Sequence, residues 1–127
     1  MIEVTQTPQP GTESVSGGGW IPVGRDKATF GLNAEREAGQ VSGHVTYHDK
    51  AGKVKVHSEG ITSLTVTGNH ATFSGPCQVN KASGFTFTVD VVDNGEPGTN
   101  DIFRIHLSNG YEASGTLGGG NIQIESE

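Results

Sequence analysis

The sequence predicts an all-β domain, either an antiparallel β-sandwich or a small β-barrel, with eight or nine short strands joined by meander hairpins. Valine and isoleucine together number 19 against 4 leucines, and there are 13 threonines. β-Branched residues suit the pleated surface of a sheet and lose side-chain freedom in a helix. No segment repeats apolar residues at helical spacing over three turns, and 20 glycines divide the chain into short pieces.

Polar and apolar residues alternate along nine segments, as is typical of antiparallel strands with one buried face. The expected strands cover residues 27–35, 40–49, 53–58, 62–67, 70–77, 84–92, 102–107, 111–117 and 121–125. Their inward positions predict a core made of Phe30, Val45, Val56, Phe73, Phe85, Phe87, Phe103 and Ile105. Glycine and asparagine in the connections suit hairpin turns, and this number of strands fits a sandwich or a barrel.

The length of 127 residues predicts one folded domain. Residues 1–16 are rich in threonine, proline, glutamine and serine, which predicts a flexible linker or a disordered N-terminus. The single all-β domain is expected to span residues 17–127 and to begin at a run of three glycines before Trp20. Because glycines leave room beside it, Trp20 is expected to fold back onto the core.

Charge and composition exclude several classes of partner. The formal net charge is −6 at pH 7, so we expect no nucleic acid and no anionic membrane surface as a partner. The sequence has no run of about 18 apolar residues, so we expect no membrane span. We also expect no signal peptide in its first residues. The single cysteine, Cys77, excludes an internal disulfide and a zinc site with several cysteines.

The segment 90–101 is the strongest candidate for a metal site. Asp90, Asp93, Glu96 and Asp101 lie within twelve residues, with glycines between them that allow sharp turns. Calcium takes six to eight oxygen ligands, which carboxylates and backbone carbonyls of one loop can supply. The alternative is a turn in which the carboxylates accept backbone N–H hydrogen bonds and need no ion.

The histidines suggest a second, weaker candidate. His44 and His48 lie on one face of the same expected strand, and the following hairpin places Lys55 and His57 on that face of the next strand. Four residues along a strand span about 13 Å, too far for one ion to bind both His44 and His48. A transition-metal site of His57 with one of the other two remains compatible with this spacing; the alternative is ordinary surface histidines.

The residue types also bear on two further functions, catalysis and carbohydrate binding. Cys77 lacks the cationic or helix-N-terminal setting that activates a thiol, and no nucleophile-elbow motif is present, so catalysis is not favoured. Carbohydrate-binding sandwiches usually expose several aromatic rings, whereas only Trp20, Tyr47 and Tyr111 supplement the five phenylalanines here. Carbohydrate binding would therefore use a polar cleft.

Several segments resemble the post-COAP module family, in the same order along residues 17–124. They are GGGWI at 17–21, KATFGL at 27–32, HS at 57–58, LTVTGNHATFSG at 64–75, DNGEPG at 93–98 with DIFRI at 101–105, and GGGNIQI at 118–124. The resemblance implies an accessory β-domain of large secreted bacterial proteins, hence an extracellular location, with no catalytic residues to carry over.

Together these observations predict a non-catalytic extracellular β-module with a spacing, stabilising or ligand-contact role in a larger protein, whose neighbouring domains are its partners. One alternative is a carbohydrate- or surface-binding module. The other is a small β-barrel enzyme, which would need a deep pocket with convergent histidines and carboxylates.

Overall fold

The computed structural model describes residues 13–23, 26–37, 39–94 and 100–126, and it confirms the all-β prediction. Strands in this part of the chain number ten, and every pairing is antiparallel. They are β1 (Glu13–Val23), β2 (Asp26–Glu37), β3 (Gln40–Asp49), β4 (Val54–Ser58), β5 (Ser63–Thr67), β6 (His70–Val79), β7 (Ala82–Val92), β8 (Ile102–Leu107), β9 (Glu112–Thr116) and β10 (Gly119–Ser126).

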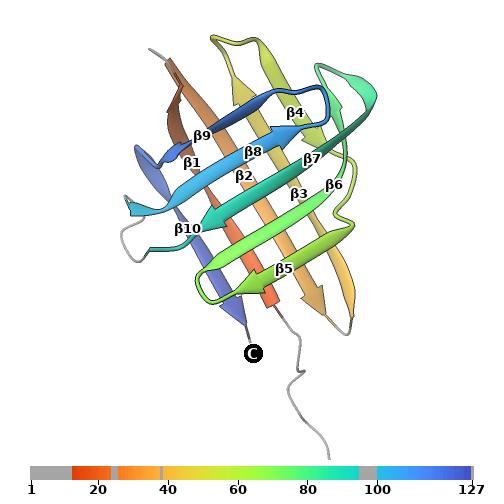
Figure 1. The fold of residues 1–127 in the computed structure, drawn as a ribbon, viewed down its shortest axis with the longest axis vertical. Coiled ribbons are helices and arrows are strands. Elements are labelled where there is room, and N and C mark those ends of the chain that lie inside the picture. Colours follow the sequence, from red (N-terminus) through yellow and green to blue (C-terminus); the bar gives the residue numbers. More distant parts are fainter. Residues whose placement is uncertain (1–12, 24–25, 38, 95–99, 127) are drawn as a thin grey trace, which may run out of the picture.

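The strands form one curled sheet that folds over into two layers. The order is β10-β1-β2-β3-β4-β6-β7-β8-β9, with β5 also paired to β6. In Figure 1, β5 to β9 form a front layer whose strands cross over a back layer of β10, β1, β2, β3 and β4. Strands that pass from one layer to the other make the corners of such a packing.

The corner between the layers lies where β4 and β6 meet. β6 pairs with β5 along its first half and with β4 through its last residues, so the chain between β4 and β5 changes layer beside it. β3 and β4 pair only as far as Thr46 and His57. Beyond that point the hydroxyl of Ser58 accepts the Val45 N–H at 2.8 Å, so a side chain replaces the missing strand.

The core lies between the layers and follows the alternation of the sequence. Seven of the eight expected core residues are buried, and the rings of Phe30 and Phe103 stack across the layers at 4.0 Å between centroids. Phe85 is the exception, being half-buried against the core. β7 pairs with β8 only from Phe87 onward, so Phe85 lacks that neighbour on one side.

Two expectations about the N-terminal part need correction. Residues 13–16, expected in the linker, belong to β1 and pair with both β2 and β10; residues 1–12 lie outside the described residues. Trp20 does not enter the core. It is half-buried on the outward side of β1, where a Cβ on Gly118 would lie 2.0 Å from its ring. The space for the ring is therefore left by Gly118, which follows β9, and not by the glycines that precede Trp20.

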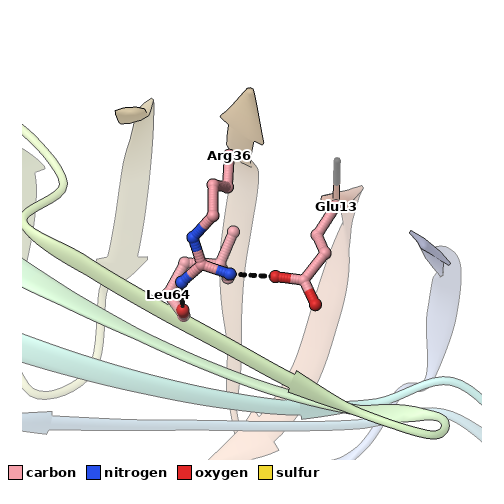
Figure 2. Close-up of polar contacts among 3 residues, drawn as sticks. All are labelled: Glu13, Arg36 and Leu64. Carbon is pink, nitrogen blue, oxygen red and sulfur yellow. Dashed lines mark hydrogen bonds and ion pairs between the residues drawn. The ribbon is translucent and has the colours of Figure 1, made fainter. Parts of the chain in front are cut away.

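Arg36 joins the two layers beside the first half of β3, which has β2 on one side and no strand on the other. Its guanidinium pairs with the Glu13 carboxylate on β1 and donates to the Leu64 carbonyl oxygen on β5 (Figure 2). The planar guanidinium offers several donors in fixed directions, which suits two acceptors on different strands. One side chain of β2 thus ties the back layer to the front-layer edge strand.

Two carboxylates close the sheet at its other end. β10 has only β1 as a strand neighbour, and on its other edge Asp101 Oδ2 accepts the Ile122 N–H at 2.8 Å while Asp93 Oδ2 accepts the Ile124 N–H at 3.1 Å. The second oxygen of Asp101 accepts the Asn94 N–H at 2.7 Å, and its side chain is fully buried. Carboxylates therefore satisfy an edge that a further strand would otherwise cover.

Asp101→Ala is expected to lower the free energy of unfolding by about 1–3 kcal/mol, because the buried Ile122 N–H loses its acceptor and the part-buried bond from the Asn94 N–H is lost with it. Asp101→Asn keeps the shape but replaces one acceptor by a donor, so it should also destabilise. Urea unfolding measures both, with the exposed Glu35→Ala as a control expected within about 0.5 kcal/mol of the parent. An Asp101→Asn protein as stable as the parent would contradict the assigned role.

Candidate ligand-binding site

The outward side of β2, β3 and β4, which we name the outer face, collects polar side chains in register. One row across the strands holds Thr29, His48 and Lys55, and the next holds Gly31, Thr46 and His57. The sequence placed Lys55 and His57 on the face of His44 and His48, and the register confirms this placement. Antiparallel pairing fixes these neighbours, since a slip of one residue would turn them into the core.

A shallow hollow of about 430 Å³ lies on the outer face. Its outward lining residues are Thr29, Gly31, Thr46, His48, Lys55 and His57. Gly31 leaves the space open, because a Cβ at this position would meet only the Thr46 hydroxyl, at 3.5 Å. The hollow thus combines hydroxyl, imidazole and ammonium groups around a bare stretch of backbone.

A second hollow of about 390 Å³ adjoins the first. It shares His48 and Lys55 with the first hollow and adds Lys50, Lys53, Asn80 and Lys81. Lys50 and Lys53 come from the β3–β4 hairpin, and Lys81 comes from the turn between β6 and β7. Four exposed ammonium groups therefore gather at one end of a chain whose net charge is −6.

Asn80 fastens the two turns together. Its backbone N–H donates to the Lys55 carbonyl at 2.8 Å, and its side-chain oxygen accepts the Lys55 N–H at 2.8 Å. Its amide nitrogen donates to the Lys53 carbonyl at 3.1 Å. Lys53, Asn80 and Lys81 all have positive φ, a conformation that non-glycine residues seldom adopt. These hydrogen bonds fix the backbone that carries three of the four lysines.

The buried carboxylate of Asp49 supports the same hairpin from inside. Asp49 is 1% exposed; its Oδ1 accepts the Gly52 N–H at 2.9 Å, and its Oδ2 accepts the Tyr111 hydroxyl at 2.6 Å. Because Tyr111 gives its only hydroxyl proton to Asp49, Tyr47 must donate to Tyr111 across 2.7 Å. Burial raises the pKa of Tyr47, and burial together with the bond to Asp49 raises the pKa of Tyr111.

Both tyrosines of the chain belong to this network, so the folded protein should form no tyrosinate at about pH 10, where free tyrosine titrates. The folded pKa values are raised; above about pH 10 the unfolded chain loses protons that the native state keeps, and stability must fall as pH rises. Tyrosinate absorbance during an alkaline titration measures this directly. Half-ionised tyrosine near pH 10 in protein that is still folded would contradict the network.

The expected calcium and histidine sites stay predictions. Within residues 13–23, 26–37, 39–94 and 100–126, no three His, Cys, Asp or Glu side chains lie together in a way that could hold an ion. His57 faces Thr46, one diagonal step from both His44 and His48, so a two-histidine site stays a prediction.

The acidic segment is divided between two sides of the fold. Asp90 faces outward on β7, where it accepts the Thr72 hydroxyl at 2.5 Å and lies 3.4 Å from His70. Asp93 and Asp101 instead turn toward β10, and Glu96 lies outside the described residues. The backbone N–H bonds to Asp93 and Asp101 are those of the alternative without an ion. Calcium binding by this segment stays a prediction, which calorimetric titration would test.

The cysteine and the larger aromatic side chains are buried or half-buried. Cys77 is fully buried, and burial together with the charge of Glu59 raises its thiol pKa to about 11, which suppresses the reactive thiolate at neutral pH. Tyr47 is buried and Tyr111 half-buried in the network. Trp20 carries Lys27 Nζ 4.4 Å from its ring centroid. The described part of the chain therefore offers no platform of exposed aromatic rings.

Sequence reasoning missed the lysine cluster. Three of its members, Lys50, Lys53 and Lys55, fall in the six-residue segment 50–55, although the whole chain has only 8 Lys and Arg. This local density of positive charge could have indicated the cluster. Lys81 lies 26 residues farther on, and the pairing of β4 with β6 and the hydrogen bonds of Asn80 bring it beside them.

Comparison with known proteins brought no relative: no family model, no characterised protein and no solved structure matched the chain. The resemblance to post-COAP modules thus stays a prediction. Among the residues described, no helix is long and apolar enough to cross a membrane.

Proposed function

We propose that this chain is a non-catalytic, extracellular β-module that contacts carbohydrate through the outer face of β2, β3 and β4. The observation that carries the proposal is the open hollow over Gly31, lined by hydroxyl, imidazole and ammonium groups. The extracellular location and the neighbouring domains of a parent protein follow from the resemblance to secreted modules.

Gly31 is the most informative residue of this hollow. Its φ is not in the left-handed region, and no backbone atom would obstruct a Cβ. Glycine inside a strand costs roughly 0.5–1 kcal/mol relative to alanine, and it often marks a place where a ligand approaches the backbone closely. A glycine without a structural need, at the floor of a hollow, supports a binding role.

The lining chemistry favours a ligand that carries many hydroxyl groups. Thr29 and Thr46 donate and accept hydrogen bonds through their hydroxyls, and His48 and His57 offer ring nitrogens of both kinds. Sugars present alternating donors and acceptors that match such a surface. Without stacked aromatic rings, the contact relies on hydrogen bonds, each worth about 1 kcal/mol net, so the affinity per sugar is expected to be modest.

A non-catalytic role is supported by the absence of acid groups at the hollows. Glycoside hydrolysis uses a pair of Asp or Glu side chains on either side of the scissile bond. Neither hollow has an Asp or Glu among its described lining residues. The barrel-enzyme alternative needed a deep pocket with convergent carboxylates, and the open hollows on the outer face give it no support.

The test is Gly31→Leu, which fills the hollow without forcing the backbone. Affinity gel electrophoresis against a panel of soluble neutral and acidic polysaccharides should show retardation of the parent protein and at least a tenfold weaker interaction for the variant. Its melting temperature should equal or exceed that of the parent, because a strand glycine is removed.

The matched control is Ser114→Leu, which adds a similar side chain to an exposed position of β9 in the front layer. It should bind as the parent does. Equal retardation of Gly31→Leu and the parent, or no retardation by any polysaccharide, would overturn the proposal.

A further inference from the structure

We propose that the carbohydrate is acidic, and that Lys50, Lys53, Lys55 and Lys81 hold its carboxylate or sulfate groups. This inference rests on the proposed function and extends it, because the hollow lined by these lysines adjoins the hollow over Gly31 through His48 and Lys55. A polysaccharide lying along the outer face would cover both hollows.

The four lysines are concentrated and unneutralised. The chain has 14 Asp and Glu against 8 Lys and Arg, yet half of these 8 cations line a single hollow. In the part of the chain that the structure describes, the ion pairs join Arg36 to Glu13, Arg104 to Glu112 and His70 to Asp90. None of them uses a lysine of this hollow.

Asp49 and Glu59, the acidic residues on either side of 50–58 in the sequence, bond to other groups. Asp49 lies beneath the hairpin, with both carboxylate oxygens bonded to Gly52 and Tyr111. Glu59 stands four residues beyond Lys55, about 13 Å along an extended strand, and it accepts hydrogen bonds from Ser83 and Gln78. The ammonium groups are therefore left to an anion from outside the chain.

The backbone holds the charges together before any ligand arrives. Asn80 bonds to the backbone of both Lys53 and Lys55, so the hairpin and the β6–β7 turn cannot separate without breaking hydrogen bonds. Gathering like charges costs electrostatic energy, which an anionic ligand removes on binding. A preorganised cluster also avoids much of the ordering cost that flexible loops incur on binding.

Carbohydrate fits the cluster better than nucleic acid does. Duplex DNA carries about one charge per 1.7 Å, so a chain of net charge −6 repels it more strongly than a polyuronate with one charge per sugar. Single strands are bound largely by stacking on aromatic rings, which the outer face lacks among its described residues. A polyuronate spaces its charges by whole sugars and offers hydroxyls to the hollow over Gly31.

Affinity electrophoresis with defined probes tests the inference: polygalacturonate for carboxylates, dextran sulfate for sulfates, unsubstituted dextran and duplex DNA. At least one acidic polysaccharide should bind ten times more tightly than dextran, and its binding should weaken as sodium chloride screens the charges. The two acidic probes distinguish carboxylate from sulfate as the recognised group. Inorganic phosphate, added as a competitor, should not displace the polysaccharide at millimolar concentration.

The variants are Lys53→Asn, Lys81→Asn and the double variant. Asparagine accepts the positive φ of both positions better than lysine does, so the melting temperature should stay equal or rise while the charge is lost. The double variant should lose at least tenfold in affinity for the acidic probe. Arg104→Gln, which removes one positive charge from the outward side of β8 in the front layer, should leave the affinity unchanged.

The outcomes separate the two proposals. The inference would be overturned, and the proposed function kept, if the protein bound dextran as tightly as the acidic polysaccharides. In that case the lysine variants would bind as the parent does, and Gly31→Leu would lose binding. Anion binding lost in the lysine variants but intact in Gly31→Leu would support the anion site and overturn the proposed function. Equal affinity for DNA, displacement by phosphate, or no binding by the acidic probes would overturn the inference.

Discussion

The buried carboxylate of Asp101 is the constraint on which the rest of the structure depends. β10 has a strand on one side only, and its other edge needs acceptors inside the protein. Asp101 takes the N–H groups of Ile122 and Asn94 at once, and its backbone oxygen accepts the Leu117 N–H at 2.9 Å. One residue thus joins the segment after β7, the end of β9 and the edge of β10, which keeps the front layer closed over the back layer.

The same solution recurs wherever strands part. Ser58 satisfies Val45 where β3 leaves β4, Asn80 satisfies Lys55 where β6 turns, and Asp49 satisfies Gly52 inside the hairpin. A polar side chain supplies the acceptor at each of these points, from a buried residue at Ser58 and Asp49 and from an exposed one at Asn80, which follows from the cost of an unpaired backbone group. The last two also hold the backbone of the lysines in place, so the same hydrogen bonds that satisfy the turns fix the proposed ligand-binding surface.

Much of the fold could be predicted from alternation, and the errors have physical causes. The strands 40–49 and 102–107 have the expected bounds, because most inward positions there hold apolar side chains separated by polar ones. The start of β1 was missed, since Val15 is the only apolar residue of 13–16 and the serines on either side of it also suit a linker. The lysine cluster depends on hydrogen bonds of one asparagine across 25 residues, and no local pattern encodes such a contact.

The most direct test of a ligand site on the outer face is to map it residue by residue. Amide chemical shifts of the labelled protein should be followed by NMR during titration with a short galacturonate oligosaccharide. The account predicts that the perturbed amides concentrate on β2, β3 and β4 and at Asn80 and Lys81, while the outward residues of β7 and β8 stay unchanged. Perturbations centred on the front layer, or none at saturating oligosaccharide, would contradict it.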